Sequence, residues 1–243
     1  MTYEEWEKAF VDGGDKGNLN TRKMARMFES ESKLTYRNES GAWPTTGIRI
    51  SKEQLEKLKE YALAKGIHLY DFENFDGDVE LIKEFIDDVA GITEDYPELI
   101  NSRKPIQIRN SFFLDDQTYA ETRKHIISIN GYAFRNRGIL EQDYKKRADK
   151  KWFVPGTDYR SIAAHECGHV IVNTYKLKKR GIILRIFPDA DMDETTKFIA
   201  KNISIYASVN SDELIAEAFS AYRSGDRTEL VLKVLDTCGI LNL

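Results

Sequence analysis

Histidine and glutamate side chains with metal-binding spacing stand in residues 165–169, which read H-E-C-G-H. The surrounding stretch, residues 161–172, is apolar and predicts one buried helix. Because residues four apart share a helical face, His165 and His169 can bind one zinc ion together. Glu166 is turned about 100° from His165 around the helix axis, which places it beside the metal. From there its carboxylate can take a proton from a zinc-bound water.

The same pentapeptide also has a structural interpretation. Two of the four histidines of the chain fall within it, and a core helix that carries two hydrogen-bonded histidines would have the same sequence. Cys167 is two residues from each histidine, so it points about 160° away from the metal face. We expect it to be a small packed side chain. A third ligand decides between the two interpretations.

A zinc site of this type needs a third protein ligand and one position open for water. No histidine follows His169, so a third histidine ligand further along the chain is excluded. Glu213 and Glu217 are four apart in a segment rich in Ala, Leu, Ile and Phe, and they share one face of a predicted helix that Asn210 or Ser211 caps. Two carboxylates on such an apolar helix are costly to bury unless a positive group meets them. A zinc ion with its histidines would do so.

The two segments together resemble the zincin metallopeptidases related to anthrax lethal factor, which include secreted Pro-Pro endopeptidases and metallopeptidase domains of phage and mobile-element proteins, often attached to minor head proteins. The family signature is H-E-x-G-H, then a tyrosine, a glutamate seven residues later, and the run E-F-F-A-E-[AS]-F. Here Tyr206 stands seven residues before Glu213, and the A-E-A-F ending is present. Leu214 and Ile215 replace the two phenylalanines, which affects packing rather than chemistry. The resemblance covers about residues 78–240.

The resemblance implies a role for each matching residue. Glu166 would be the general base, and Tyr206 would hydrogen-bond the developing oxyanion or donate a proton. Without the family spacing, Tyr206 would be read as an ordinary half-buried aromatic residue. Glu217 is interpreted as orienting a ligand histidine through the distal N–H of that ring, with a solvated helix charge as the alternative. The zinc ligands would be His165, His169 and Glu213.

These residues predict a zinc-dependent endopeptidase of the gluzincin type, with H-E-x-x-H and a downstream glutamate. Its substrate would be a peptide or protein in extended conformation. The biological setting could be a phage or mobile-element effector, a toxin or a processing protease. Two alternatives stay open: a non-catalytic, zinc-stabilised binding module of a phage or mobile element, and a regulatory protease that cleaves repressors.

Composition is that of a globular protein with a core and a well-solvated surface. The chain has 243 residues, 41% hydrophobic and 31% charged, with a net charge of −4. This charge gives no general attraction to nucleic acid or anionic lipid. The two cysteines imply no disulfide framework. No signal peptide and no membrane-spanning run is visible, so we expect a cytoplasmic or virion-associated protein.

The predicted fold class is α+β, a zincin-like metallopeptidase with a small mixed sheet and the H-E-x-x-H helix. Residues 1–75 are expected to form a mainly helical accessory region and residues 76–243 the metallopeptidase domain. A capping box at Ser51 opens the first clear helix, which closes at Gly66. The other expected elements are helices at 81–91, 137–152 and 230–235 and strands at 105–109, 125–130 and 181–187.

Four further local features are interpreted from the sequence. Residues 122–130 are assigned as the strand that runs beside the metal cleft and offers its edge to substrate. Thr157 or Asp158 is expected to cap the zinc-binding helix. Asp191 lies in an aspartate-rich stretch that resembles a calcium loop but lacks its glycine and glutamate, so a capped helix start is the better interpretation. The basic residues near Lys145 are read as a solvated face rather than a DNA-binding patch.

Overall fold

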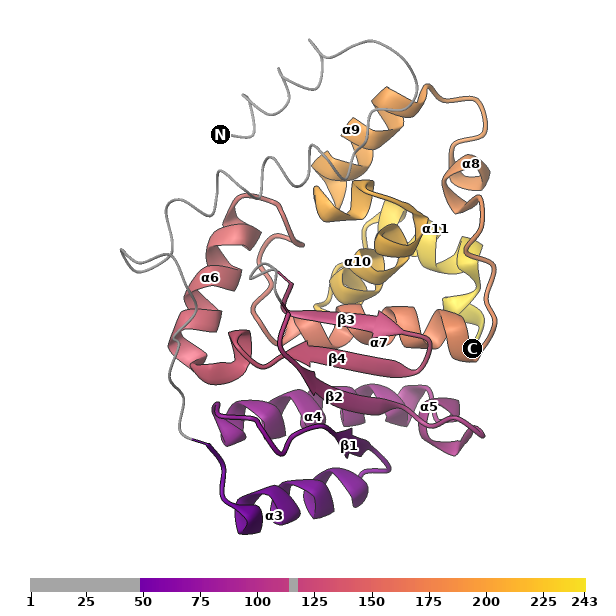
Figure 1. Cartoon of the computed structure of the whole chain (residues 1–243). Coiled ribbons are helices and arrows are strands. Elements are labelled where there is room, and N and C mark those ends of the chain that lie inside the picture. Colours follow the sequence, from indigo (N-terminus) through magenta and orange to yellow (C-terminus); the bar gives the residue numbers. More distant parts are fainter. Residues whose placement is uncertain (1–48, 114–117) are drawn as a thin grey trace.

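The computed structural model describes residues 49–113 and 118–243, which contain a four-stranded mixed sheet (Figure 1). Its strands are β1 (His68–Tyr70), β2 (Gln107–Ser111), β3 (Ala120–Arg123) and β4 (Ile126–Asn130). In the order β1-β2-β4-β3, the first three are parallel and β3 pairs antiparallel with β4. The molecule is therefore mixed α+β with a small mixed sheet, as the sequence predicts.

The predicted strands at 105–109 and 125–130 are present as β2 and β4. Burial alternates along β2, where Ile108 is fully buried, which is the pattern that predicts a half-buried strand. β4 is buried from Ile127 to Asn130, as expected for a strand inside the sheet.

The assignment of residues 122–130 to one substrate-side strand is corrected. The chain reverses at Lys124 and His125, where Lys124 adopts the left-handed conformation with φ of 62°. The segment is therefore split between β3 and β4, and β4 lies inside the sheet. Among the described residues, β3 forms the sheet edge on this side, so the edge expected to face a substrate corresponds to residues 120–123.

The helices before β2 begin as predicted, but one extends further. The capping box is present, with the Gln54 backbone N–H donating to Ser51 Oγ at 3.1 Å and the Ser51 N–H donating to the Gln54 side chain at 2.9 Å. The helix predicted to stop at Gly91 continues, because Ile92 carries its buried face onward. These elements are α3 (Lys52–Leu63), α4 (Val79–Asp95) and the short α5 (Glu98–Asn101).

Two helical predictions after β4 are confirmed. The helix expected at 137–152 is α6 (Arg137–Asp149), which follows the 3-10 turn η1 (Ala133–Arg135). The Asp191 side chain caps α9 (Met192–Asn202) by accepting from two backbone N–H groups. The aspartate-rich stretch is therefore a helix start, as expected.

The strand predicted at 181–187 is wrong. Gly181 is left-handed, with φ of 68°, and opens the short helix α8 (Ile182–Ile186). Its end residues are four apart and both buried, which is helical spacing. An apolar run this short fits either period, so sequence alone could not distinguish them.

The helices that carry the candidate site are α7 (Ser161–Thr174) and α10 (Ser211–Arg223), with α11 (Glu229–Cys238) packed behind α10. α7 also packs against β3 and α4 (Figure 1). The predicted cap of α7 is displaced: Asp158 accepts from the Arg160 N–H at 2.9 Å in the preceding turn, and no side chain caps the helix itself. The remaining elements are the 3-10 turns η2 (Tyr206–Ser208) and η3 (Ile240–Asn242).

A glycine allows the two site helices to approach closely. A Cβ placed on Gly168 of α7 would lie 3.0 Å from the Cα of Ala216 and 3.3 Å from the Cβ of Phe219, both on α10. Any larger residue would therefore push the helices apart. Gly168, the glycine of H-E-C-G-H, thus allows the short distance between α7 and α10.

The predicted accessory region, residues 1–75, lies only partly within the described residues. Its described part supplies α3 and β1, and β1 pairs with β2 in the sheet; the division of the chain at residue 75 stays a prediction. In the described part of the chain, every helix is too short or too polar to cross a membrane.

Candidate metal centre

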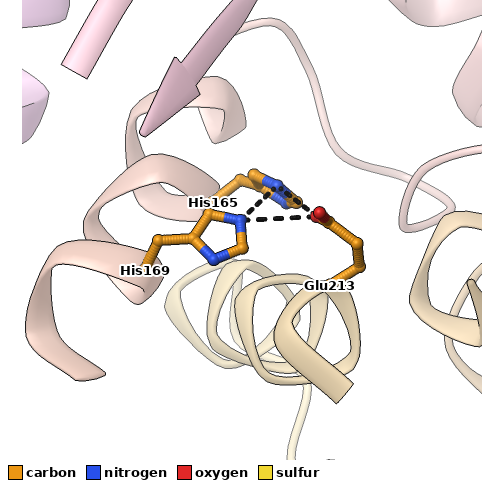
Figure 2. A group of neighbouring side chains, drawn as sticks. All are labelled: His165, His169 and Glu213. Carbon is orange, nitrogen blue, oxygen red and sulfur yellow. Dashed lines mark hydrogen bonds and ion pairs between the residues drawn. The ribbon is translucent and has the colours of Figure 1, made fainter. Parts of the chain in front are cut away.

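The side chains of His165, His169 and Glu213 converge between α7 and α10 (Figure 2). The two histidine Nε2 atoms are 3.3 Å apart. Glu213 Oε2 lies 3.2 Å from Nε2 of His165 and 3.3 Å from Nε2 of His169. The structure thus brings together, in a nearly equilateral triangle, one donor atom from each of the three residues predicted as metal ligands.

The neighbouring sequence explains why Glu213 faces the histidines. The Asn210 side chain accepts from the backbone N–H groups of Asp212 and Glu213 at 2.8 and 3.0 Å, which fixes the start of α10. Asn210 rather than Ser211 is therefore the cap. Glu213 falls in the first turn, on the face that packs against α7.

The triangle fits a tetrahedral cation. A tetrahedron with bonds of about 2.0–2.1 Å has edges of about 3.3–3.4 Å, whereas an octahedron with the same bonds has edges of about 2.9 Å. The observed edges are 3.2–3.3 Å. In addition, Glu213 Oε2 is buried and accepts no well-aligned hydrogen bond, a costly arrangement for a carboxylate oxygen. A cation at the centre would satisfy it.

The histidine and glutamate side chains at the centre shift one another's pKa values. Burial disfavours the protonated form of His165, but its contacts with Glu213 and Glu217 outweigh burial and raise the pKa of His165 well above its usual value. Burial likewise disfavours ionised Glu213, but the two histidines outweigh it and hold the pKa of Glu213 well below its usual range. The pocket therefore favours a negative carboxylate facing positive charge.

Glu217 lies behind the triangle, one turn further along α10. Its Oε1 is 2.8 Å from His165 Nδ1, and its Oε2 accepts from Ser204 Oγ at 2.7 Å. Ser204 Oγ in turn accepts from the Ala207 N–H at 3.0 Å. With Nδ1 bonded to a carboxylate, the Nε2 of His165 is left as the ring atom that can bind a metal.

Ser204 was not anticipated from the sequence. It is fully buried, yet a single serine among apolar residues gives no signal of the residue it will meet. Its hydrogen bonds with Glu217 and with the Ala207 N–H together join α10 to η2, the turn that carries Tyr206.

Glu166 is buried on α7 beside His165 and is held by the edge strand β3. Thr122 of β3 donates from Oγ1 to Glu166 Oε2 at 2.6 Å. Sequence reasoning placed Thr122 in a substrate-side strand but did not connect it to Glu166. This hydrogen bond links the sheet edge to the candidate base.

Tyr206 lies against His165, with ring centroids 5.6 Å apart and an interplanar angle of 23°. Its ring also packs against the rings of Trp152 and Phe153, with centroid distances of 5.8 and 6.0 Å. The Tyr206 backbone N–H donates to the Trp152 carbonyl at 3.0 Å, which holds η2 against the chain that leads into α7. Tyr206 thus lines the same cleft as the triangle.

The centre opens into a polar cleft between β3, the C-terminal half of α7 and the start of α10. A second recess adjoins it on the side of Tyr206 and is walled by aromatic rings. The cleft is lined by residues that include Thr118, Thr122, Asn173, Lys179 and Asp212. The recess is lined by residues that include Tyr119, Tyr144, Trp152 and Phe153.

Comparison with protein-family models, curated proteins and solved structures found no match. Function is therefore inferred from the side chains and their geometry.

Cys167 stands apart from this chemistry. It is fully buried, and burial raises the pKa of its thiol. A buried neutral thiol is a packing group rather than a metal ligand, as the helical spacing predicts.

Proposed function

We propose that the chain is a zinc-dependent endopeptidase of the zincin type, in keeping with its resemblance to the metallopeptidases related to lethal factor. Zinc would be held by His165, His169 and Glu213. The observation that carries the proposal is the triangle of donor atoms with edges of 3.2–3.3 Å, formed by the H-E-x-x-H helix and a glutamate of a second helix. These edges suit tetrahedral zinc.

Zinc bound there would supply Lewis acidity, lowering the pKa of a water to near 7 and polarising the scissile carbonyl. Glu166 would accept the proton of that water and pass it to the leaving amine. Thr122 fixes one oxygen of Glu166, so the carboxylate keeps one orientation while the proton moves. Glu217 keeps the His165 ring in place through Nδ1.

Tyr206 is the residue we assign to charge stabilisation. It lies against His165 and lines the cleft, so its side chain can reach a substrate carbonyl there. Removal of one donor to an oxyanion commonly costs about 2.7–4 kcal/mol of barrier.

The substrate would bind as an extended peptide along β3. Among the described residues this strand is at the sheet edge and packs against α7, which carries two of the ligands. An extended chain can pair with such an edge through backbone hydrogen bonds, while side-chain pockets select residues.

A purely structural zinc site is less consistent with the geometry. Structural sites are usually closed by four protein ligands, whereas catalytic sites leave one position open. Among the described residues the cluster has three ligating residues, beside a cleft and a second buried carboxylate, Glu166.

The test compares the zinc-loaded chain with its Glu166→Gln variant on a random peptide library read by mass spectrometry. We expect cleavage by the wild type and a loss of several orders of magnitude in the variant, which should keep its zinc. Equal cleavage by the two proteins would remove Glu166 from its role. No cleavage by the zinc-loaded wild type would contradict the proposed activity.

A further inference from the structure

The chain that leads away from one end of the cleft is rich in positive charge. Between Glu166 and Asp189 the sequence has five lysine and arginine residues and no acidic residue, although the whole chain carries a net charge of −4. The three lysines of this segment, together with the last residue of β3 and the first residue of the β3–β4 turn, form what we call the basic rim: Arg123, Lys124, Lys176, Lys178 and Lys179.

Two contacts hold the rim at the cleft. The Asn173 side chain donates to the Lys124 carbonyl at 3.1 Å, so the β3–β4 turn lies against the end of α7 (Figure 1). In the loop between α7 and α8, Lys179 pairs with Asp212 at the start of α10 at 2.9 Å. This loop therefore connects the end of α7, beside the β3–β4 turn, with the start of α10. Asn173, Lys179 and Asp212 all line the cleft.

Most of the rim charge is uncompensated. Arg123 pairs with Glu121 at 3.3 Å, in an exposed contact. Lys124, Lys176 and Lys178 are exposed, and no carboxylate of the described residues lies within ion-pair distance of any of them. Cations on a cleft rim attract a ligand of opposite charge and favour its orientation.

Backbone conformation adds an independent observation. Lys124 has φ of 62° and Lys176 has φ of 54°. Glycine adopts this left-handed region without strain, and a lysine there costs free energy. Two lysines are thus held at strained turns near Asn173, which lines the cleft and contacts the Lys124 carbonyl.

We propose that the basic rim selects substrates with acidic residues on one side of the scissile bond, an inference that rests on the proposed peptidase function. Thr122 contacts Glu166, so the reacting bond lies level with that residue of β3. Lys124 follows two residues later, in the turn where β3 ends, and two residues of chain span at most about 7 Å. The acidic side chains of the substrate are therefore placed about two to four residues from the bond that is cut.

The experiment measures binding apart from turnover, with the full-length Glu166→Gln protein loaded with zinc. Four fluorescent peptides share one apolar centre and carry three glutamates or three lysines on either the N-terminal or the C-terminal flank. In anisotropy titrations, one of the two acidic peptides should bind about tenfold more tightly than its lysine counterpart, and added salt should reduce the difference.

Charge reversal at the rim is the decisive variant. Lys124→Glu with Lys178→Glu should abolish or invert the preference, since both side chains are exposed and make no ion pair with a described residue. The matched control is Lys52→Glu with Lys57→Glu on α3, which packs against β1 at the opposite edge of the sheet. It changes the net charge equally and should leave the preference unchanged.

Three results would overturn the proposal: equal binding of acidic and basic peptides, equal effects of the rim and control variants, or tighter rim-dependent binding of a single-stranded oligonucleotide than of any acidic peptide. Failure of the peptidase function looks different. Acidic peptides would then bind in a rim-dependent manner but stay intact with zinc-loaded wild type. Cleavage without a preference for either flank would instead support the peptidase function and show that the basic rim does not select substrates.

Discussion

At the scale of single residues, the candidate base depends on a hydroxyl that lies far away in sequence. Thr122 and Glu166 are 44 residues apart, yet their side chains meet at 2.6 Å. A carboxylate that accepts a short hydrogen bond from a packed strand has fewer orientations than one facing water alone.

Thr122→Val removes the hydroxyl and keeps the shape of the side chain. We expect kcat to fall about tenfold to a hundredfold, in line with the loss of other supporting hydrogen bonds at metal sites, while KM and bound zinc stay near wild type. Thr122→Ser keeps the hydroxyl and should recover most of kcat. Steady-state kinetics on a cleaved library peptide, with zinc content measured in parallel, checks this. A change confined to KM would argue for a role of Thr122 in binding instead.

Residue types and spacing predicted the centre better than they predicted its support. Paired histidines and glutamates four apart in helical segments require no knowledge of the fold, because a helix places such residues on one face. Thr122 and Ser204 come from other elements, and their meeting with Glu166 and Glu217 follows from packing. Single polar residues of this kind carry no sequence signal.

At the scale of elements, the distance between α7 and α10 depends on Gly168. Gly168→Ala would place a methyl group 3.0 Å from the Ala216 backbone. We expect a loss of about 1–3 kcal/mol in the free energy of unfolding, together with weaker zinc binding, because the ligands stand on both helices.

A second glycine is the matched control for this change. Gly91 lies within α4 and has open space around its Cβ position, so Gly91→Ala should stabilise the protein by about 0.5–1 kcal/mol. Chemical denaturation of both variants checks the pair. Equal effects would show that helix propensity, rather than the distance between α7 and α10, controls the response.

Errors in the predicted elements share one physical cause. The strand expected at 181–187 is α8, and the helix expected to end at Gly91 runs on. In both places a local signal, a short apolar run or a glycine, was outweighed by burial against other parts of the fold. Long periodic segments such as α7 and α10 were predicted well, because their pattern extends over several turns.

At the scale of the whole molecule, a cation between α7 and α10 would join two parts of the core. Zinc at a thousandfold excess over its Kd stabilises the folded state by about 4 kcal/mol. For a chain of this size we expect Tm to rise by roughly 8–16 °C on adding zinc. Scanning fluorimetry with and without a chelator measures the shift.

Two neighbouring acidic residues, Glu213 and Asp212, distinguish zinc binding at the triangle from nonspecific binding of zinc to negative charge. Glu213→Ala should abolish most of the zinc-dependent rise in Tm, since it removes one of three ligands. Asp212→Ala should retain the rise, because Asp212 pairs with Lys179 and is not in the triangle. If both variants respond to zinc like the wild type, the ion binds elsewhere.

Lys176, the left-handed residue after α7, is expected to lower thermal stability while it contributes to selection between substrates. Lys176→Gly should relieve a φ of 54° and raise the free energy of unfolding by about 1 kcal/mol, or Tm by about 2–4 °C. The same change should weaken the preference for acidic peptides while zinc content stays constant. Calorimetry and anisotropy on one preparation check both effects, and an unchanged Tm would show that the turn is unstrained. Selection for thermal tolerance alone would thus favour glycine at this turn and yield a sturdier, less discriminating protein.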